Sequence, residues 1–223
     1  MSTALWWIRR DLRLGDNQAL AAALAAAGQV VPVFVLDPAL LASPYTGDKR
    51  LAFLFDGLRS LDADLRQRGS RLVLRQGDPV DELARLRDET GAETIFAEAD
   101  VTPYARRRDE RMAAQLPLRL ARGLTAQRPS AVVKDDGSPY TVFTPFSKRW
   151  LSLPLPAPAD LLPAPERIAT PAGLDSLPLP HAPARPAGVP FPAGEAEAQR
   201  RLAAFVEGDQ AAITRYREDR NRP

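Results

Sequence analysis

The stretch LWWIRRDLRLGDNQAL, residues 5–20, contains the first predicted strand and the most charged turn of the chain. The apolar run Ala4–Ile8 ends abruptly at a group of charged residues, Arg9, Arg10, Asp11 and Arg13. An alanine- and leucine-rich run follows Asp16 and Asn17, either of which can cap a helix. A buried strand that leads through a polar turn into a helix is typical of the start of an α/β domain.

The same alternation continues along the chain. Residues 30–36 (VVPVFVL), 71–74 and 94–97 (TIFA) are short apolar runs that predict further strands. Leucine and phenylalanine recur with helical spacing from Leu51 to Leu65. Strands that are apolar almost throughout, alternating with amphipathic helices, predict a doubly wound α/β domain with a parallel sheet over residues 1–130.

Capping residues set the predicted helix boundaries. Asp78 is the expected N-cap of a helix that begins at Pro79. Gly28 is expected to end the first helix, and Gly69 the helix that starts near Leu51.

The sequence changes character after residue 130. A turn is predicted at Asp136–Gly137, before an aromatic-rich segment, and residues 154–192 contain twelve prolines. Each proline removes a backbone donor and fixes its own φ, so this stretch forms neither a helix nor a central strand. We assign residues 131–194 to a connecting segment and proline-rich linker that lies against the domain or is partly disordered. Helical spacing returns at residues 195–206, and the charged end at Pro223 indicates a cut fragment.

Composition excludes several classes of protein. The chain has no cysteine, which excludes disulfides, thiolate catalysis and cysteine zinc sites and fits a cytoplasmic protein. Its one histidine, His181, lies among prolines, so we expect no metal centre and no histidine-dependent triad. No apolar run approaches the ~20 residues that span a membrane, and a net charge of +2 does not argue for nucleic acid.

Charged residues follow three of the predicted strands. They are the Arg9–Arg13 group after the first strand, Asp37 after the second, and Glu98 and Asp100 after the fourth. In a doubly wound sheet, ligands bind beyond the carboxyl ends of the strands, where the strand order reverses. No glycine-rich phosphate loop and no G-x-S-x-G elbow is present. The residues therefore predict a charged ligand-binding edge and no recognisable hydrolytic apparatus, so no residue of the chain is assigned a catalytic role.

The charged turn has two interpretations, because it either braces the chain or holds a ligand. We favour bracing, through an ion pair between Arg10 and Asp11. Arg9 and Arg13 are expected to project toward the ligand edge or toward a second domain.

Aromatic residues near this edge are assigned mainly to packing. Trp6 and Trp7 lie in a buried strand and are expected in the core rather than in an electron relay. Phe53 is also expected in the core, whereas Tyr104 adds aromatic surface.

The opening stretch resembles that of the DNA photolyase and cryptochrome family, which reads W-F-R-R-D-L-R-L-x-D-N-x-A-L. VFVLD, GDPVDEL and DVTPYARRRDERM resemble later landmarks of that family, in the same order. GSPYTVFTPFSKRW is similar to its Y-x-V-F-T-P-F-x-x-x-W stretch, and residues 194–223 resemble the first helices of its flavin-binding domain. The resemblance covers essentially the whole chain outside the proline-rich connection.

This resemblance implies a five-stranded, Rossmann-like sheet over residues 1–130. It implies that residues 195–223 begin a truncated helical domain that binds flavin adenine dinucleotide (FAD). In photolyases, reduced FAD donates an electron to a flipped-out pyrimidine dimer, the cyclobutane ring splits and the electron returns. The implied partner is therefore damaged DNA. Residues 1–223 alone are expected to be inactive, because the family's T-S-x-x-S-x-Y-L flavin loop would follow them.

The resemblance also implies a light-harvesting antenna at the α/β domain. DVTPYARRRDE slightly favours 8-hydroxy-5-deazaflavin over methenyltetrahydrofolate. The residues that match the antenna pocket are Asp37, Lys49, Arg50, Glu98 and Asp100. Tyr216 matches a tyrosine that contacts FAD, and Arg220 an arginine that contacts DNA beside the lesion.

Three functions remain open at this point. The first is the N-terminal part of a deoxyribodipyrimidine photolyase, expected to be a monomer. A cryptochrome that senses blue light without repair shares the same landmarks. The third is a free-standing α/β nucleotide-binding or electron-transfer protein related only by fold, against which the YREDRNRP ending argues.

Overall fold

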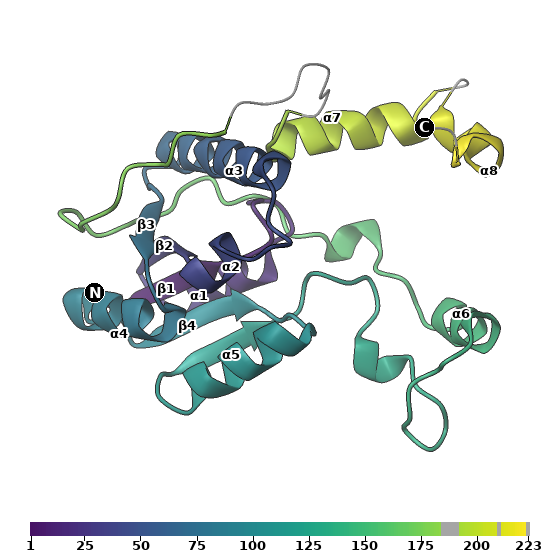
Figure 1. Cartoon of the computed structure of the whole chain (residues 1–223), viewed down its shortest axis with the longest axis horizontal. Coiled ribbons are helices and arrows are strands. Elements are labelled where there is room, and N and C mark those ends of the chain that lie inside the picture. The colour runs from purple at the N-terminus through teal and green to yellow at the C-terminus, as the bar shows by residue number, and fades with distance from the viewer. Residues whose placement is uncertain (184–191, 209–210, 222–223) are drawn as a thin grey trace.

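The computed structural model describes residues 1–183, 192–208 and 211–221. Its centre is a parallel sheet of five strands in the order β3-β2-β1-β4-β5. The strands are β1 (Thr3–Ile8), β2 (Gln29–Leu36), β3 (Val73–Gln76), β4 (Thr94–Glu98) and β5 (Leu118–Ala121). Strand order reverses between β1 and β4, so the predicted doubly wound sheet is confirmed (Figure 1).

Helices cover both faces of the sheet. One face packs against α1 (Gln18–Ala26) and α3 (Asp48–Gln67), and the other against α4 (Pro79–Thr90) and α5 (Pro103–Ala113). Alternate residues of β1 supply the two cores, with Trp6 on the α1–α3 side and Trp7 on the α4–α5 side. Both tryptophans are at most 2% exposed, which confirms their core positions.

Local capping explains where these helices begin. The Asn17 side chain accepts the Leu20 N–H at 2.9 Å, and the Asp78 side chain caps α4. Gly69 follows α3 with a φ of 77°, as expected for the end of that helix. The predicted role of Gly28 is wrong. The first helix ends at Ala26, and an extended Ala27 leads directly into β2 without a left-handed residue.

Two strands differ from the sequence prediction. The third strand begins at Val73, two residues later than expected. The fifth strand, β5, is implied by the family resemblance, but its position escaped prediction because it is an edge strand with polar Arg119 and a Leu120 that is 45% exposed. A strand that is not buried on both faces lacks the continuous apolar run by which the other strands were found.

Part of the proline-rich segment, residues 162–183, lies against the α/β layers and is called the strap here. Ile168 is fully buried in the core formed with α1 and α3. The Ile168 N–H donates to the Arg68 carbonyl at 2.9 Å, and the Leu177 N–H donates to the Leu74 carbonyl at 2.9 Å. The strap therefore packs against the domain. Of the two expectations for the proline-rich linker, this one is confirmed for the strap. Residues 184–191 of the predicted linker lie outside the described residues.

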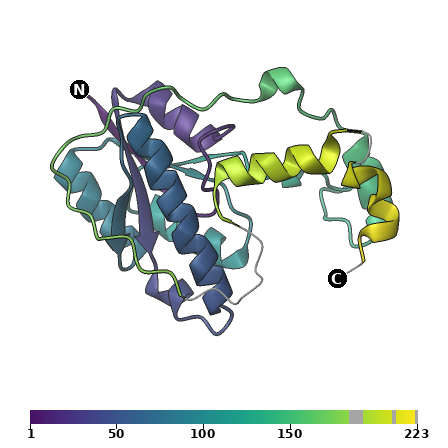
Figure 2. The ribbon, with the colours of Figure 1, turned by 90° about the horizontal axis from the view of Figure 1, so that it is seen from above.

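Three helices lie outside the α/β layers. These outer helices are α6 (Phe143–Leu151), α7 (Glu195–Val206) and the short α8 (Tyr216–Asp219). They contain no buried residue, and both ribbon views show them projecting away from the sheet (Figures 1 and 2). The short α2 (Pro38–Leu41) follows β2. Within the described ranges, no helix has both the length and the apolar character needed to cross a bilayer.

Candidate functional site

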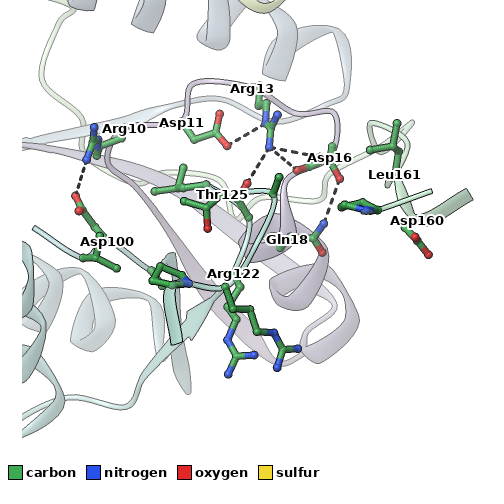
Figure 3. Close-up of a pocket in the computed structure, with 18 of the residues that line it drawn as sticks. Arg10, Asp11, Arg13, Asp16, Gln18, Asp100, Arg122, Thr125, Asp160 and Leu161 are labelled. Atoms are coloured by element: carbon green, nitrogen blue, oxygen red, sulfur yellow. Dashed lines mark hydrogen bonds and ion pairs between the residues drawn. The ribbon is translucent and has the colours of Figure 1, made fainter. Parts of the chain in front are cut away.

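A cavity of about 1170 Å³ lies at the carboxyl ends of β1, β4 and β5. The point where strand order reverses, between β1 and β4, borders this cavity, so it occupies the predicted ligand-binding edge. Three groups of residues line it (Figure 3). They are Arg10, Asp11, Arg13, Asp16 and Gln18 near β1, Ala99–Val101 after β4, and parts of the loops 122–129 and 154–161.

The charged turn after β1 braces one wall of the cavity. Arg13 contacts Asp11 at 3.0 Å and Asp16 at 3.5 Å, and Arg10 reaches Asp100 of the β4 loop at 3.2 Å (Figure 3). The predicted Arg10–Asp11 ion pair is therefore wrong. Neighbouring side chains in an extended turn point in different directions, so Arg10 and Asp11 each find a partner elsewhere.

Arg9 is buried beneath α5 and does not project toward the cavity or a second domain as expected. Its Nη1 lies 2.5 Å from Asp109, and its Nη2 donates to the Glu98 carbonyl. The guanidiniums of Arg9 and Arg108 both lie over the Trp7 ring, each 4.7 Å from its centroid. This buried group fixes the end of β1 against α5.

Two carboxyl groups of the cavity wall have opposite pKa shifts. Burial raises the pKa of Asp11 to about 6, against the opposing effect of the Arg13 charge. At Asp100 burial also acts upward, but hydrogen bonds from Thr102 and Arg10 outweigh it and lower the pKa. Asp100 is therefore ionised at neutral pH. Asp11 exchanges its proton near pH 6, which is close to neutral.

Of the five residues predicted to line an antenna pocket, Asp100 lies on the cavity wall. Glu98 lies behind the wall and is 7% exposed. Its Oε1 accepts the Ala19 N–H at 2.9 Å, at the first turn of α1, where the helix dipole favours a carboxylate. Among the described residues, its Oε2 has no hydrogen-bond partner, and it lies against Gly123, where an added Cβ would approach it to 2.7 Å. Gly123 is therefore needed for this close approach.

The other three predicted antenna residues do not line the cavity. Asp37 is 7% exposed, caps α2 and accepts the Tyr104 hydroxyl. Burial and this hydrogen bond raise the pKa of Tyr104 to about 12. Lys49 and Arg50 are exposed on α3, where Arg50 donates to the Tyr45 carbonyl at 2.9 Å.

The residues matched to FAD and DNA lie on α8 and at its end. Tyr216 is 53% exposed and packs edge-to-face against Phe205, with ring centroids 5.9 Å apart. Arg220 ends α8, and its N–H donates to the Tyr216 carbonyl at 3.0 Å. Phe53 was wrongly expected in the core. It is 51% exposed, because it falls outside the buried α3 stripe that includes Leu58.

Several cavity residues were missed from the sequence. Arg122, Thr125 and Arg128 follow β5, and Asp160 and Leu161 belong to the proline-rich stretch. The first group was missed because β5 itself was missed. Gly123, which is separated from the short LRLA run by Arg122 alone, is the signal that could have marked this strand end.

The model of the DNA photolyase family matches residues 4–166. The chain belongs to the DNA photolyase and cryptochrome family. This membership removes the alternative of a protein related by fold alone.

Relatives of this photolyase-family chain have several names. A deoxyribodipyrimidine photo-lyase from Thermus thermophilus is 35% identical over 100% of the chain and 48% of its own length. An uncharacterized 31.6 kDa protein from Synechococcus sp. PCC 6716 is 37% identical over 98% of the chain and 79% of its own length. A cryptochrome DASH from Natronomonas pharaonis is 31% identical over 99% of the chain and 50% of its own.

Solved structures show the same architecture. A class III photolyase from Agrobacterium tumefaciens superposes with a TM-score of 0.84 at 29% identity, over 98% of this chain and 47% of that one. An archaeal photolyase from Sulfolobus tokodaii, described with two FAD molecules, gives a TM-score of 0.64 at 25% identity. The match covers 75% of this chain and 37% of that one. The photolyase-family chain thus spans about half of several longer relatives.

Proposed function

We propose that the cavity holds the antenna chromophore of a light-dependent, FAD-containing DNA photolyase. The observation that carries this proposal is the cavity of about 1170 Å³ beside the reversal of strand order. Its volume is slightly above the range of about 300–1,000 Å³ that is typical of cofactor sites, so a planar organic cofactor has room to enter. Val101, Leu124 and Leu155 offer apolar surface for a flat ring. Asp100 and Asp11 offer acceptors for polar groups at the edge of that ring.

The fit rests on fixed polar groups as well as on volume. Asp100 is held by Arg10 and by the Thr102 N–H, so its carboxylate has a defined position on the wall. Asp11 is held in the same way by Arg13. When bound, the chromophore would absorb light and pass its excitation to the flavin. The residues of this chain would bind it, orient it and shield one face from water.

The chemical step belongs to the whole protein. Splitting a cyclobutane pyrimidine dimer requires reduced FAD to donate one electron and to take it back after the ring opens. We propose that Tyr216 contacts that FAD and that Arg220 contacts damaged DNA beside the lesion. The exposed position of Tyr216 on α8 supports the first assignment, because the side chain is free to meet a further domain. No residue of this chain is assigned a catalytic role.

Three chromophores are candidates for the cavity. 8-Hydroxy-5-deazaflavin and methenyltetrahydrofolate are those implied by the family resemblance. The Sulfolobus tokodaii photolyase adds a flavin, since its structure is described as implying a novel light-harvesting cofactor. We retain the slight preference for 8-hydroxy-5-deazaflavin as a proposal. We also propose that the protein is a monomer. A cytoplasmic location is proposed because the chain has no cysteine.

A cryptochrome is the second candidate. It is favoured by the cryptochrome DASH relative, which matches 99% of the chain. A light sensor would use the same cavity and the same FAD without releasing repaired DNA. Illumination of the longer protein with dimer-containing DNA separates the two, because only a photolyase restores the undamaged strand.

The cavity is tested by titrating the three chromophores into the purified chain and following absorbance and fluorescence. Ala126→Trp places a large side chain on the cavity wall without disturbing the core, because Ala126 is exposed. We expect this variant to lose binding and the control Arg50→Ala, outside the cavity, to keep it. Loss in the control with retention in Ala126→Trp would place the chromophore near α3 instead.

A further inference from the structure

The carboxylates that line the cavity all have partners. Asp11 and Asp16 contact Arg13, and Asp100 contacts Arg10. Asp160, on the proline-rich side, accepts the backbone N–H of Ala157 at 2.7 Å. These contacts also occupy Arg10 and Arg13, so the wall near β1 offers a ligand little uncompensated charge.

The loop after β5 is different. Arg122 and Arg128 line the cavity and are exposed, and within the described chain neither guanidinium makes a hydrogen bond or an ion pair. Figure 3 shows the Arg122 side chain directed away from the group formed by Arg13 and Asp16. Among the described residues, the cavity therefore has two cations without counter-charges, both on one loop.

This loop is held in place at both ends. Gly123 lies against the Glu98 carboxylate, and its carbonyl accepts a hydrogen bond from Arg13 at 3.4 Å. Near the other end, the Gln127 side chain donates to the Pro154 carbonyl at 2.9 Å. The two arginines are thus attached to a backbone that is fixed relative to the cavity.

We propose that Arg122 and Arg128 bind an anionic tail on the ligand of this cavity. A guanidinium donates a planar pair of hydrogen bonds that matches phosphate or carboxylate oxygens. The apolar and internally paired walls suit a flat ring, and the two arginines suit the charged end of the same molecule. The ligand class is therefore a ring chromophore that carries a phosphate or glutamate carboxylates, in preference to the same ring without them. For the preferred deazaflavin, this means a form whose side chain is phosphorylated. This inference rests on the proposed antenna function and adds the part of the ligand that the arginines recognise.

The test compares flavin mononucleotide with riboflavin, which share the ring and ribityl chain and differ in the phosphate. We expect the wild-type chain to bind flavin mononucleotide about tenfold more tightly, as expected for charge-assisted hydrogen bonds. The double variant Arg122→Gln, Arg128→Gln should bind both flavins with the affinity that wild type has for riboflavin. The double variant Arg122→Lys, Arg128→Lys should keep part of the preference for flavin mononucleotide over riboflavin. Added salt should weaken the phosphate-dependent part alone.

The matched control is Arg106→Gln, Arg107→Gln, which removes two exposed arginines of α5 that do not line the cavity. It should keep the wild-type preference. A second arm replaces the flavins with methenyltetrahydrofolate carrying one or several glutamates. A glutamate-dependent affinity that the glutamine variant loses would identify the carboxylate tail as the source of the anion.

The outcomes separate the two proposals. Equal affinity of wild type for flavin mononucleotide and riboflavin, and for short and long folates, would overturn the anionic-tail site and leave the ring cavity standing. A preference that survives in the glutamine variant would overturn the assignment to these arginines. Failure of every flavin, folate and 8-hydroxy-5-deazaflavin to bind would overturn the antenna function itself and this inference with it.

Discussion

The α/β layers and the outer helices differ in where their apolar side chains lie. In the layers, Trp6 and Leu58 are at most 1% exposed, within the core between the sheet and helices α1 and α3. On α6 and α7, Phe143 is 76% exposed, Leu151 71% and Leu202 61%. The layers, together with Ile168 of the strap, therefore bury an apolar core. The outer helices, in contrast, do not bury their apolar faces against the described residues.

The largest expected effect is the loss of a buried charge partner within the layers. Asp109→Ala leaves Arg9 and Arg108 without their carboxylate, and breaking such a pair costs about 3–5 kcal/mol. Glu197→Ala on α7, which removes an exposed pair with Arg200, should leave the unfolding midpoint nearly unchanged. Urea unfolding followed by tryptophan fluorescence measures both. Similar losses of stability in the two variants would contradict the proposed difference between the layers and the outer helices.

A second variant tests whether the strap belongs to the layers. Ile168→Ala removes a fully buried side chain from the α1–α3 core and should lower the free energy of unfolding by roughly 3 kcal/mol. Leu177→Ala, on the same strap but 43% exposed, should lower it by about 1 kcal/mol or less. The same urea series measures this pair. If Ile168→Ala has no more effect than its control, the strap is not part of the core.

Asp11 is expected to give the layers a pH dependence. Because burial raises its pKa to about 6, above the ~3.9 of an unfolded aspartate, the folded state binds more protons between these values. Its contribution to stability is therefore present at low pH and is lost as pH rises from about 4 to 6. The rise of the pKa from about 4 to about 6 corresponds to about 3 kcal/mol at pH 7. Because Asp11→Asn also removes the ion pair with Arg13, the variant should lose that decline and be stabilised at pH 7 by about 1 kcal/mol. Parallel stability curves for wild type and variant between pH 4 and 8 would contradict this.

The smallest effect is expected for Tyr216 on α8. Tyr216→Phe keeps the ring that packs on Phe205 and lies outside the cavity lining. Binding of a chromophore to the cavity should therefore change less than about twofold, roughly 0.4 kcal/mol. Fluorescence titration of the variant measures this. A tenfold loss would show that the outer helices contribute to the site.

The sequence was most informative where residues are buried on both faces. β1, β2 and β4 are continuous apolar runs, and the helices opposite them show period 3.6, so sheet and layers were predictable. β5 was not, because an edge strand keeps polar side chains such as Arg119 toward solvent. The predicted helix at residues 195–206 matches α7, although its apolar face remains uncovered.

The candidate site was predictable only in part. The edge follows from the fold class, and Asp100 lies there as expected. Individual partners do not follow, because they depend on side-chain directions that a linear sequence does not contain. Arg10 pairs with Asp100, and Arg9 turns beneath α5. The loop with Arg122 and Arg128 follows β5, whose position was not predicted, so no pattern connected these arginines to the site.

Hydrogen exchange of the purified chain, with and without a bound chromophore, tests the central claim that the layers are self-supporting and contain the binding site. Amides of β1, β2 and β4 should exchange at the rate set by global unfolding, and those of α6 and α7 much faster. A chromophore should add protection at residues 9–18, 122–129 and 154–161 and none on α7. Protection of α7 equal to that of β1, or no added protection around the cavity, would contradict the account.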